Sequence, residues 1–125
     1  YGADGVQMGT RFVTTEECDV HPNFKQRYLD ATEEDMVVIK SPVGMPGRAI
    51  RPPFIDRVED GRIPPEKCNR CLTPCKAEEA PYCITQALIN AARGDVEHGL
   101  VFSGSNAYRA TKIETVADIF KELTE

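Results

Sequence analysis

The first ten residues constrain the fold more than any other stretch of this sequence. The segment Ala3–Met8 is short, carries no charge after Asp4 and lies between Gly2 and Gly9. A short apolar run bounded by glycine is typical of a strand that is covered on both faces. We therefore expect a buried β-strand at the start of the chain and an α/β fold around it.

A glycine and a threonine follow this expected strand. Glycine allows the backbone to approach a ligand closely, and adjacent N–H groups together with a threonine hydroxyl can form a pocket for a phosphate group. In a (β/α)8 barrel, the loops after strands seven and eight usually hold such a phosphate. Gly9 and Thr10 are thus candidate phosphate ligands. An ordinary turn after a strand is the alternative, because isolated glycine motifs are weak signals.

The run from Gly2 to Phe12, followed by Thr15-Glu16-Glu17 and His21-Pro22, resembles the eighth barrel strand and following loop of the nitronate monooxygenase family. This family was formerly called 2-nitropropane dioxygenase and includes the flavin-dependent enoyl-acyl-carrier-protein reductase II. The resemblance continues more loosely through residues 47–51 and 99–104. Members of the family use FMN. The resemblance implies that Gln7, Met8, Gly9 and Thr10 hold the FMN phosphate.

The resemblance also implies an architecture. The chain would be the C-terminal fragment of a (β/α)8 TIM barrel, carrying the last strand and the last helix, with an inserted and mostly helical small domain. We expect the last strand and phosphate-binding turn in residues 1–17, the inserted domain with its Cys-rich segment 68–83 in residues 18–96, and the return segment and final helix in residues 97–125. A whole barrel typically needs about 250 residues, and this chain has 125. The missing N-terminal part of the barrel is therefore an expected partner.

The leading functional hypothesis is an FMN-dependent oxidoreductase with a small-molecule substrate. Its substrate would be a nitronate, with oxygen as acceptor, or an enoyl thioester, with a nicotinamide donor. The family carries a catalytic histidine in a His-Gly-Gly type motif, and neither His21 nor His98 lies in such a motif. We therefore expect the catalytic base to precede this chain, and the chain alone to be inactive.

Four of the five cysteines form a cluster. Cys68, Cys71, Cys75 and Cys83 have the spacing C-x2-C-x3-C-x7-C, and Cys18 lies apart from them. Thiolates two or three residues apart can meet at one centre, so the cluster predicts a zinc or iron–sulfur site. Buried apolar cysteines are the alternative, since free cysteine is often only a small hydrophobic residue. A non-enzymatic, four-cysteine metal-binding module is accordingly the second functional hypothesis.

Two arginines and one glycine-containing turn are weaker candidates. Arg48 and Arg51 could grip an anionic group, since guanidinium forms paired hydrogen bonds to carboxylate or phosphate, or they could pin a loop to nearby carboxylates. Residues 103–105 could line the flavin pocket, although a plain turn is the simpler interpretation. His21 precedes a proline at the start of a predicted helix and is expected to cap or pack.

Periodicity predicts helices after Pro22, from Pro81 to a stop at Gly94, and from Thr115. It predicts short strands at residues 36–39 and 100–102. Thr14 and Thr15 are expected to open a helical turn. The proline-rich residues 42–53 are expected to be irregular, and residues 56–67 to form an exposed loop.

The formal net charge of -5, with lysine and arginine spread along the chain, argues against binding to nucleic acid. No apolar run approaches the roughly 18 residues of a membrane span. An odd total of five cysteines, four of them clustered, favours metal or redox chemistry over a secreted disulfide framework. We therefore expect a cytoplasmic protein, and the sequence leaves a homo-oligomer open.

Overall fold

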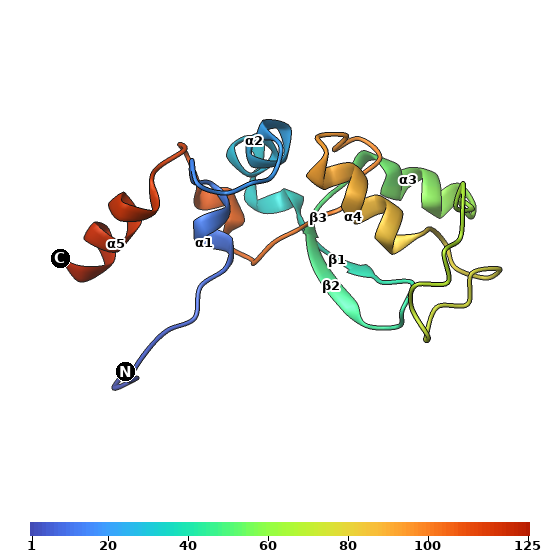
Figure 1. The fold of residues 1–125 in the computed structure, drawn as a ribbon, viewed down its shortest axis with the longest axis horizontal. Helices are drawn as coiled ribbons and strands as arrows, with labels where there is room; N and C mark the ends of the chain where they lie inside the picture. The colour runs from blue at the N-terminus through green and yellow to red at the C-terminus, as the bar shows by residue number, and fades with distance from the viewer.

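The computed structural model describes residues 1–125 and has an elongated α/β fold (Figure 1). Its helices are α1 (Thr10–Val13), α2 (Pro22–Asp30), α3 (Pro53–Asp60), α4 (Ile84–Ala92) and α5 (Val116–Thr124), and two short 3-10 helices, η1 (Glu33–Asp35) and η2 (Ala107–Arg109), accompany them. The strands are β1 (Met36–Lys40), β2 (Pro46–Ile50) and β3 (Val101–Phe102). None of the helices is both long enough and apolar enough to span a lipid bilayer.

The sheet is antiparallel, with the order β1-β2-β3. Strands β1 and β2 form a hairpin in which Met36 lies opposite Ile50 and Lys40 opposite Pro46. Gly44 has a φ of 91° in the connecting turn, a left-handed conformation that favours glycine. Strand β3 arrives from much later in the sequence and pairs with the end of β2.

Two clusters of buried side chains hold these elements together. The first joins the sheet to α3 and α4 and contains Ile39, Ala49, Phe54, Tyr82, Ala87 and Leu100. The second joins the sheet to α2, α4 and η2 and contains Tyr28, Ile50, Ala91, Val101 and Ala107. Because Ala49 and Ile50 are neighbours on β2, their side chains point to opposite faces of the sheet. Helix α4 contributes Ala87 to the first cluster and Ala91 to the second, so it packs against both groups of elements.

Several elements predicted from periodicity are confirmed. Helix α4 covers residues 84–92, and Gly94 follows it with a φ of 100°. Helix α5 starts after Thr115, whose hydroxyl and the Asp118 carboxylate form a reciprocal capping box. His21 caps α2 as expected, since its Nδ1 accepts a hydrogen bond from the Asn23 N–H at 3.1 Å. These signals are local, so one sequence suffices to find them.

Three local expectations are wrong. Residues 42–53 are not irregular, because β2 forms there once β1 and β3 pair with it. Residues 53–60 are helical rather than loop, because the Phe54 side chain is buried against the core. Thr14 and Thr15 open no helix: both are buried, and α1 ends just before them.

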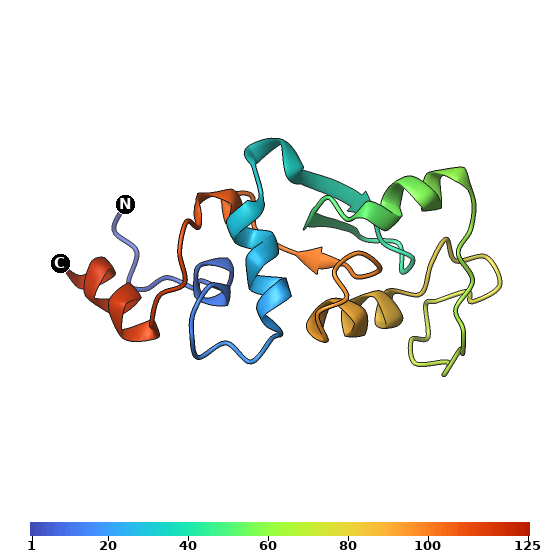
Figure 2. The ribbon, with the colours of Figure 1, turned by 90° about the horizontal axis from the view of Figure 1, so that it is seen from above.

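The strand expected at residues 3–8 does not form: these residues have no regular secondary structure, with a bend at Asp4, and lie outside the sheet. Residues 1–9 are all exposed, and the ribbon leaves the body of the molecule at this end (Figure 1). The small sheet is built from β1, β2 and β3 instead. Both termini lie at one end of the molecule and the cysteine-rich loop at the other (Figure 2). The division into three segments stays a prediction.

The buried side chain of Tyr28 makes the stability of the protein depend on pH. Burial, and secondarily the nearby Cys18 thiol, raise the pKa of Tyr28 to about 12 from its ordinary value near 10. The native state therefore keeps the phenol proton at pH values where the unfolded chain loses it. Tyr28 therefore makes its full contribution to the free energy of unfolding below about pH 10. As the pH rises toward 12, the free energy of unfolding falls by up to about 1.4 kcal/mol per pH unit.

Urea unfolding across this alkaline range measures the effect. The variant Tyr28→Phe should show a shallower decline in unfolding free energy than the unaltered protein. A residual slope is expected, because burial also raises the pKa of Tyr82. An identical slope in the variant would contradict the assignment to Tyr28.

Candidate cofactor-binding site

Residues Gln7, Met8 and Gly9 form an exposed, extended segment that leads into α1. No hydrogen bond within the chain uses the backbone N–H groups of residues 7–10 as donors. A Cβ atom added at Gly9 would meet no atom within 4 Å. The backbone is thus open to close approach by a ligand, and its donors bond to no other group of the chain.

Thr10 connects this segment to the turn at residues 103–105. Its Oγ1 accepts a hydrogen bond from the Gly104 N–H at 2.8 Å, although the two residues are 94 positions apart in sequence. A Cβ added at Gly104 would lie 2.8 Å from the same oxygen. Glycine is therefore needed at position 104 for this close contact, and the contact places the two predicted segments side by side.

The geometry fits a phosphate group. A phosphate oxygen accepts hydrogen bonds, and the four N–H groups of residues 7–10 supply donors that the chain itself does not use. The Thr10 hydroxyl accepts from Gly104, so its own proton is free to be donated.

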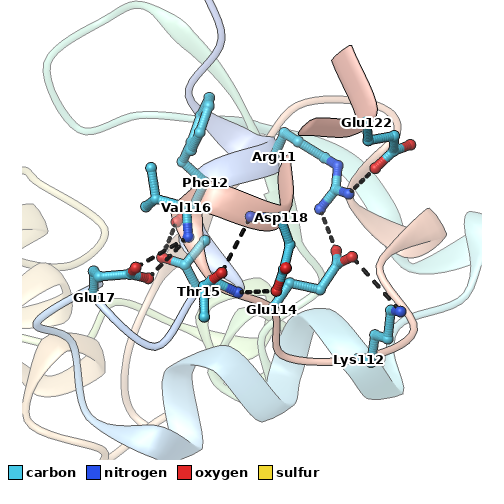
Figure 3. A network of polar contacts seen from close by, with 10 residues as sticks. Arg11, Phe12, Thr15, Glu17, Lys112, Glu114, Val116, Asp118 and Glu122 are labelled. Atoms are coloured by element: carbon cyan, nitrogen blue, oxygen red, sulfur yellow. Dashed lines mark hydrogen bonds and ion pairs between the residues drawn. The ribbon is translucent and has the colours of Figure 1, made fainter. Parts of the chain in front are cut away.

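A network of ion pairs fixes the residues just after Thr10 (Figure 3). The Arg11 guanidinium lies 2.8 Å from a Glu114 oxygen and 2.6 Å from a Glu122 oxygen. Glu114 first, and then Glu122, raise the pKa of Arg11 above its ordinary value. Lys112 also contacts Glu114, at 3.7 Å. The network joins α1 to α5 and so anchors the open segment to the C-terminal helix.

Backbone contacts reinforce this connection. Thr15 and Glu114 form a parallel bridge, in which the Glu114 N–H donates to the Thr14 carbonyl and the Glu16 N–H donates to the Glu114 carbonyl. The Glu17 carboxylate accepts from the Val116 N–H at 3.0 Å, at the start of α5 (Figure 3). Residues 10–17 and 112–122 therefore form one unit, although one comes from each end of the sequence.

The two arginines of the 42–53 segment have different surroundings. Arg51 forms an ion pair with Asp56 at 2.6 Å, as expected of a residue that pins a loop. Arg48 lies exposed on β2 and forms no ion pair. Its carbonyl accepts from the Ser103 N–H at 3.1 Å, which places β2 next to the turn that contacts Thr10. Arg48 therefore stays a prediction as an anion ligand.

The four clustered cysteines line one cavity of about 550 Å3. Cys68 and Cys71 are exposed, Cys75 and Cys83 are half-buried, and all of them are free thiols. No three metal-ligating side chains converge on one point in the structure. The four-cysteine metal site is thus not assembled here, and it stays a prediction.

Three features of this site lay outside the sequence-based prediction. They are the Thr10–Gly104 hydrogen bond, the Arg11–Glu114–Glu122 network and the Glu17 carboxylate at the start of α5. Each joins residues about a hundred positions apart. Such pairs carry no local pattern, and only the folded chain brings them together.

Comparisons with known proteins identify the family of this chain. The family model for nitronate monooxygenase matches residues 1–125, so the chain belongs to the nitronate monooxygenase family, which is a family of oxidoreductases. A probable nitronate monooxygenase of Staphylococcus haemolyticus is 39% identical over 74 residues, which is 58% of this chain and 21% of the relative.

Two further similar proteins carry names other than nitronate monooxygenase. The (3aS,4S,5R,7aS)-5-hydroxy-7a-methyl-1-oxo-octahydro-1H-indene-4-carboxyl-CoA dehydrogenase of Mycobacterium tuberculosis is 43% identical over 61 residues, covering 49% of this chain and 17% of that protein. The structure of FabK from Thermotoga maritima matches with a TM-score of 0.73 and 33% identity, covering 98% of this chain and 36% of that chain. The chain therefore spans about a third of the similar structure and less of the curated relatives.

Proposed function

We propose that this chain is the C-terminal part of an FMN-dependent oxidoreductase and that residues 7–10 bind the phosphate of the flavin. The observation that carries the proposal is the set of N–H donors in this segment that bond to no other group of the chain, next to an unobstructed Gly9. The family assignment supports it, because members of the nitronate monooxygenase family use FMN. It also favours an enzyme over a non-enzymatic metal-binding module.

Residues 3–8 suit the role of a last barrel strand. They are exposed and pair with no strand of this chain, as expected of a segment whose neighbours lie in the N-terminal part of a (β/α)8 barrel. In this arrangement α5 is the last barrel helix. Its exposed Phe120 and Leu123 side chains would then be covered by the rest of the barrel.

These positions suggest a role for the cofactor and for each residue of the segment. FMN, when bound, supplies the redox chemistry. Gln7, Met8 and Gly9 bind through their backbone N–H groups, and Thr10 through its N–H and hydroxyl. Arg11 holds α1, which begins at Thr10, against α5 through Glu114 and Glu122, so the end of this segment is anchored to the body of the molecule. The proton-transferring base is assigned to the part of the barrel that precedes residue 1.

The substrate belongs to one of two classes. Alkyl nitronates are the first candidate, since the family model and a Staphylococcus haemolyticus relative carry that name. An enoyl thioester with a nicotinamide donor is the alternative, and the similarity to FabK favours it. Assays of the full-length protein with a nitronate plus oxygen, and with an enoyl thioester plus NAD(P)H, distinguish them. We place the enzyme in the cytoplasm, where either substrate is available.

Thr10→Ala tests the phosphate site. The variant removes the hydroxyl that accepts from Gly104, and a hydrogen bond to a charged group contributes about 1.5–3 kcal/mol. FMN affinity of the full-length protein should fall about 10- to 100-fold, measured by the fluorescence of titrated flavin. Thr10→Ser retains the hydroxyl and should restore binding.

Thr111→Ala is the matched control, because Thr111 is exposed and lies outside the site. Its FMN affinity should equal that of the unaltered protein. Unchanged FMN affinity in Thr10→Ala, with the protein folded, would remove residues 7–10 from the phosphate site.

A further inference from the structure

Residues 61–83, which we name the cysteine lobe, connect α3 to α4 without any helix or strand. Hydrogen bonds join the two ends of the lobe, which we call its base. The Ile63 N–H donates to the Pro81 carbonyl at 2.8 Å, and the Arg62 Nε donates to the Ala80 carbonyl at 2.9 Å. Irregular loops of this length inside a compact domain are uncommon and usually have a function of their own.

Beyond its closed base, the cysteine lobe has little to hold its shape. No residue from 64 to 79 is buried. The backbone hydrogen bonds within this stretch are short-range turns, such as the Cys75 N–H to the Leu72 carbonyl at 3.2 Å. Small segments that cannot build an apolar core are generally held by disulfides or by a metal ion. All five cysteines of the chain are free thiols, so no disulfide holds the lobe.

The four thiols of the lobe surround one space. Cys68, Cys71, Cys75 and Cys83 all line the cavity of about 550 Å3. Two of them meet the first turn of α4: the Cys83 Sγ accepts from the Gln86 N–H at 3.5 Å, and the Cys71 Sγ lies 3.2 Å from the Thr85 Oγ1. Two of the four sulfurs therefore lie at the start of α4, on the wall of the same cavity.

The surroundings favour the same chemistry. Lys67 and Arg70 line the cavity beside a single carboxylate, that of Glu78, so positive charge is available to offset thiolates. Arg70 is the one non-glycine residue with a positive φ, at 51°. This left-handed residue lies between Cys68 and Cys71. Backbone strain of this kind persists where the surrounding structure or a ligand requires it.

We propose that Cys68, Cys71, Cys75 and Cys83 bind a thiophilic metal centre, either a zinc ion or an iron–sulfur cluster. Because no three ligating groups converge in the structure, the lobe closes around the metal as it binds. Each thiol transfers its proton to water as its sulfur becomes a ligand. The centre is structural: the lobe lies at the end of the molecule opposite residues 7–10 (Figures 1 and 2), far from the proposed flavin phosphate.

The test is metal analysis of the full-length protein purified without oxygen and without chelators. We expect about one zinc per chain for a four-thiolate site, or iron with acid-labile sulfide and a brown colour. The double variant Cys68→Ser/Cys75→Ser should lose the metal. Cys18→Ser is the matched control, because Cys18 lies outside the lobe, and it should retain the full metal content.

A second measurement does not depend on the folding of a variant. In the unaltered protein the four lobe thiols should resist alkylation, and a chelator should expose them, as counted by mass spectrometry. The proposal is overturned if the purified protein contains neither metal and takes up no added Zn2+ or Co2+. It is also overturned if the double variant keeps the metal, or if the lobe cysteines are found as disulfides.

Discussion

Replacing Gly99 with alanine is expected to destabilise the protein by about 3 kcal/mol or more, because the added methyl group has no space. A Cβ at this position would lie 2.5 Å from the Ala91 backbone nitrogen and 2.7 Å from the Asp95 carbonyl oxygen. These are backbone atoms at the end of α4, so they cannot move aside as a flexible side chain would. The free energy of unfolding in urea measures the loss.

Gly61→Ala is the matched control. An added Cβ at Gly61 meets no atom within 4 Å, so the variant should unfold within about 0.5 kcal/mol of the unaltered protein. If Gly99→Ala were equally neutral, the close packing of residue 99 against α4 would not exist in solution.

Truncation of Tyr28 to alanine is expected to cost about 3–5 kcal/mol, as for other large aromatic side chains in a core. The Tyr28 side chain is only 1% exposed and lies in the cluster that joins α2 to the sheet. Its hydroxyl donates to the Phe102 carbonyl at 2.7 Å. Loss of the ring therefore leaves a cavity and an unpaired carbonyl at the edge of β3.

Tyr28→Phe separates the two contributions. It keeps the ring and removes only the hydroxyl, so it should cost about 1 kcal/mol. Urea unfolding of both variants gives the comparison. Equal losses in the two variants would mean that the hydrogen bond, and not the packing of the ring, dominates at this position.

The sequence predicted those elements whose signals are local. Helix α4 has apolar residues at helical spacing and Gly94 after its end, and α5 has the capping pair Thr115 and Asp118. Strand β2 was missed because its proline and glycine content argues against a strand. Its formation depends on pairing with β1 and β3, which no local pattern records.

The candidate site shows the same limit. The resemblance of the opening residues to the nitronate monooxygenase family predicted phosphate ligands at residues 7–10. The family is confirmed, and the ligands stay a prediction. The hydrogen bond between Thr10 and Gly104 spans 94 residues and could not be found from the sequence. The strand expected at residues 3–8 does not form in the structure, where the only sheet consists of β1, β2 and β3.

The pairing of β3 with β2 joins the parts of the chain before and after the cysteine lobe by non-covalent contacts. Strands β1 and β2 come from before the cysteine lobe, whereas α4 and β3 come from after it, yet all of them share both buried clusters. The bridge between Thr15 and Glu114 joins the same two halves a second time. A single protease cut in the lobe would therefore yield two polypeptides that stay associated, and separate expression of the halves offers a split protein that reassembles by complementation.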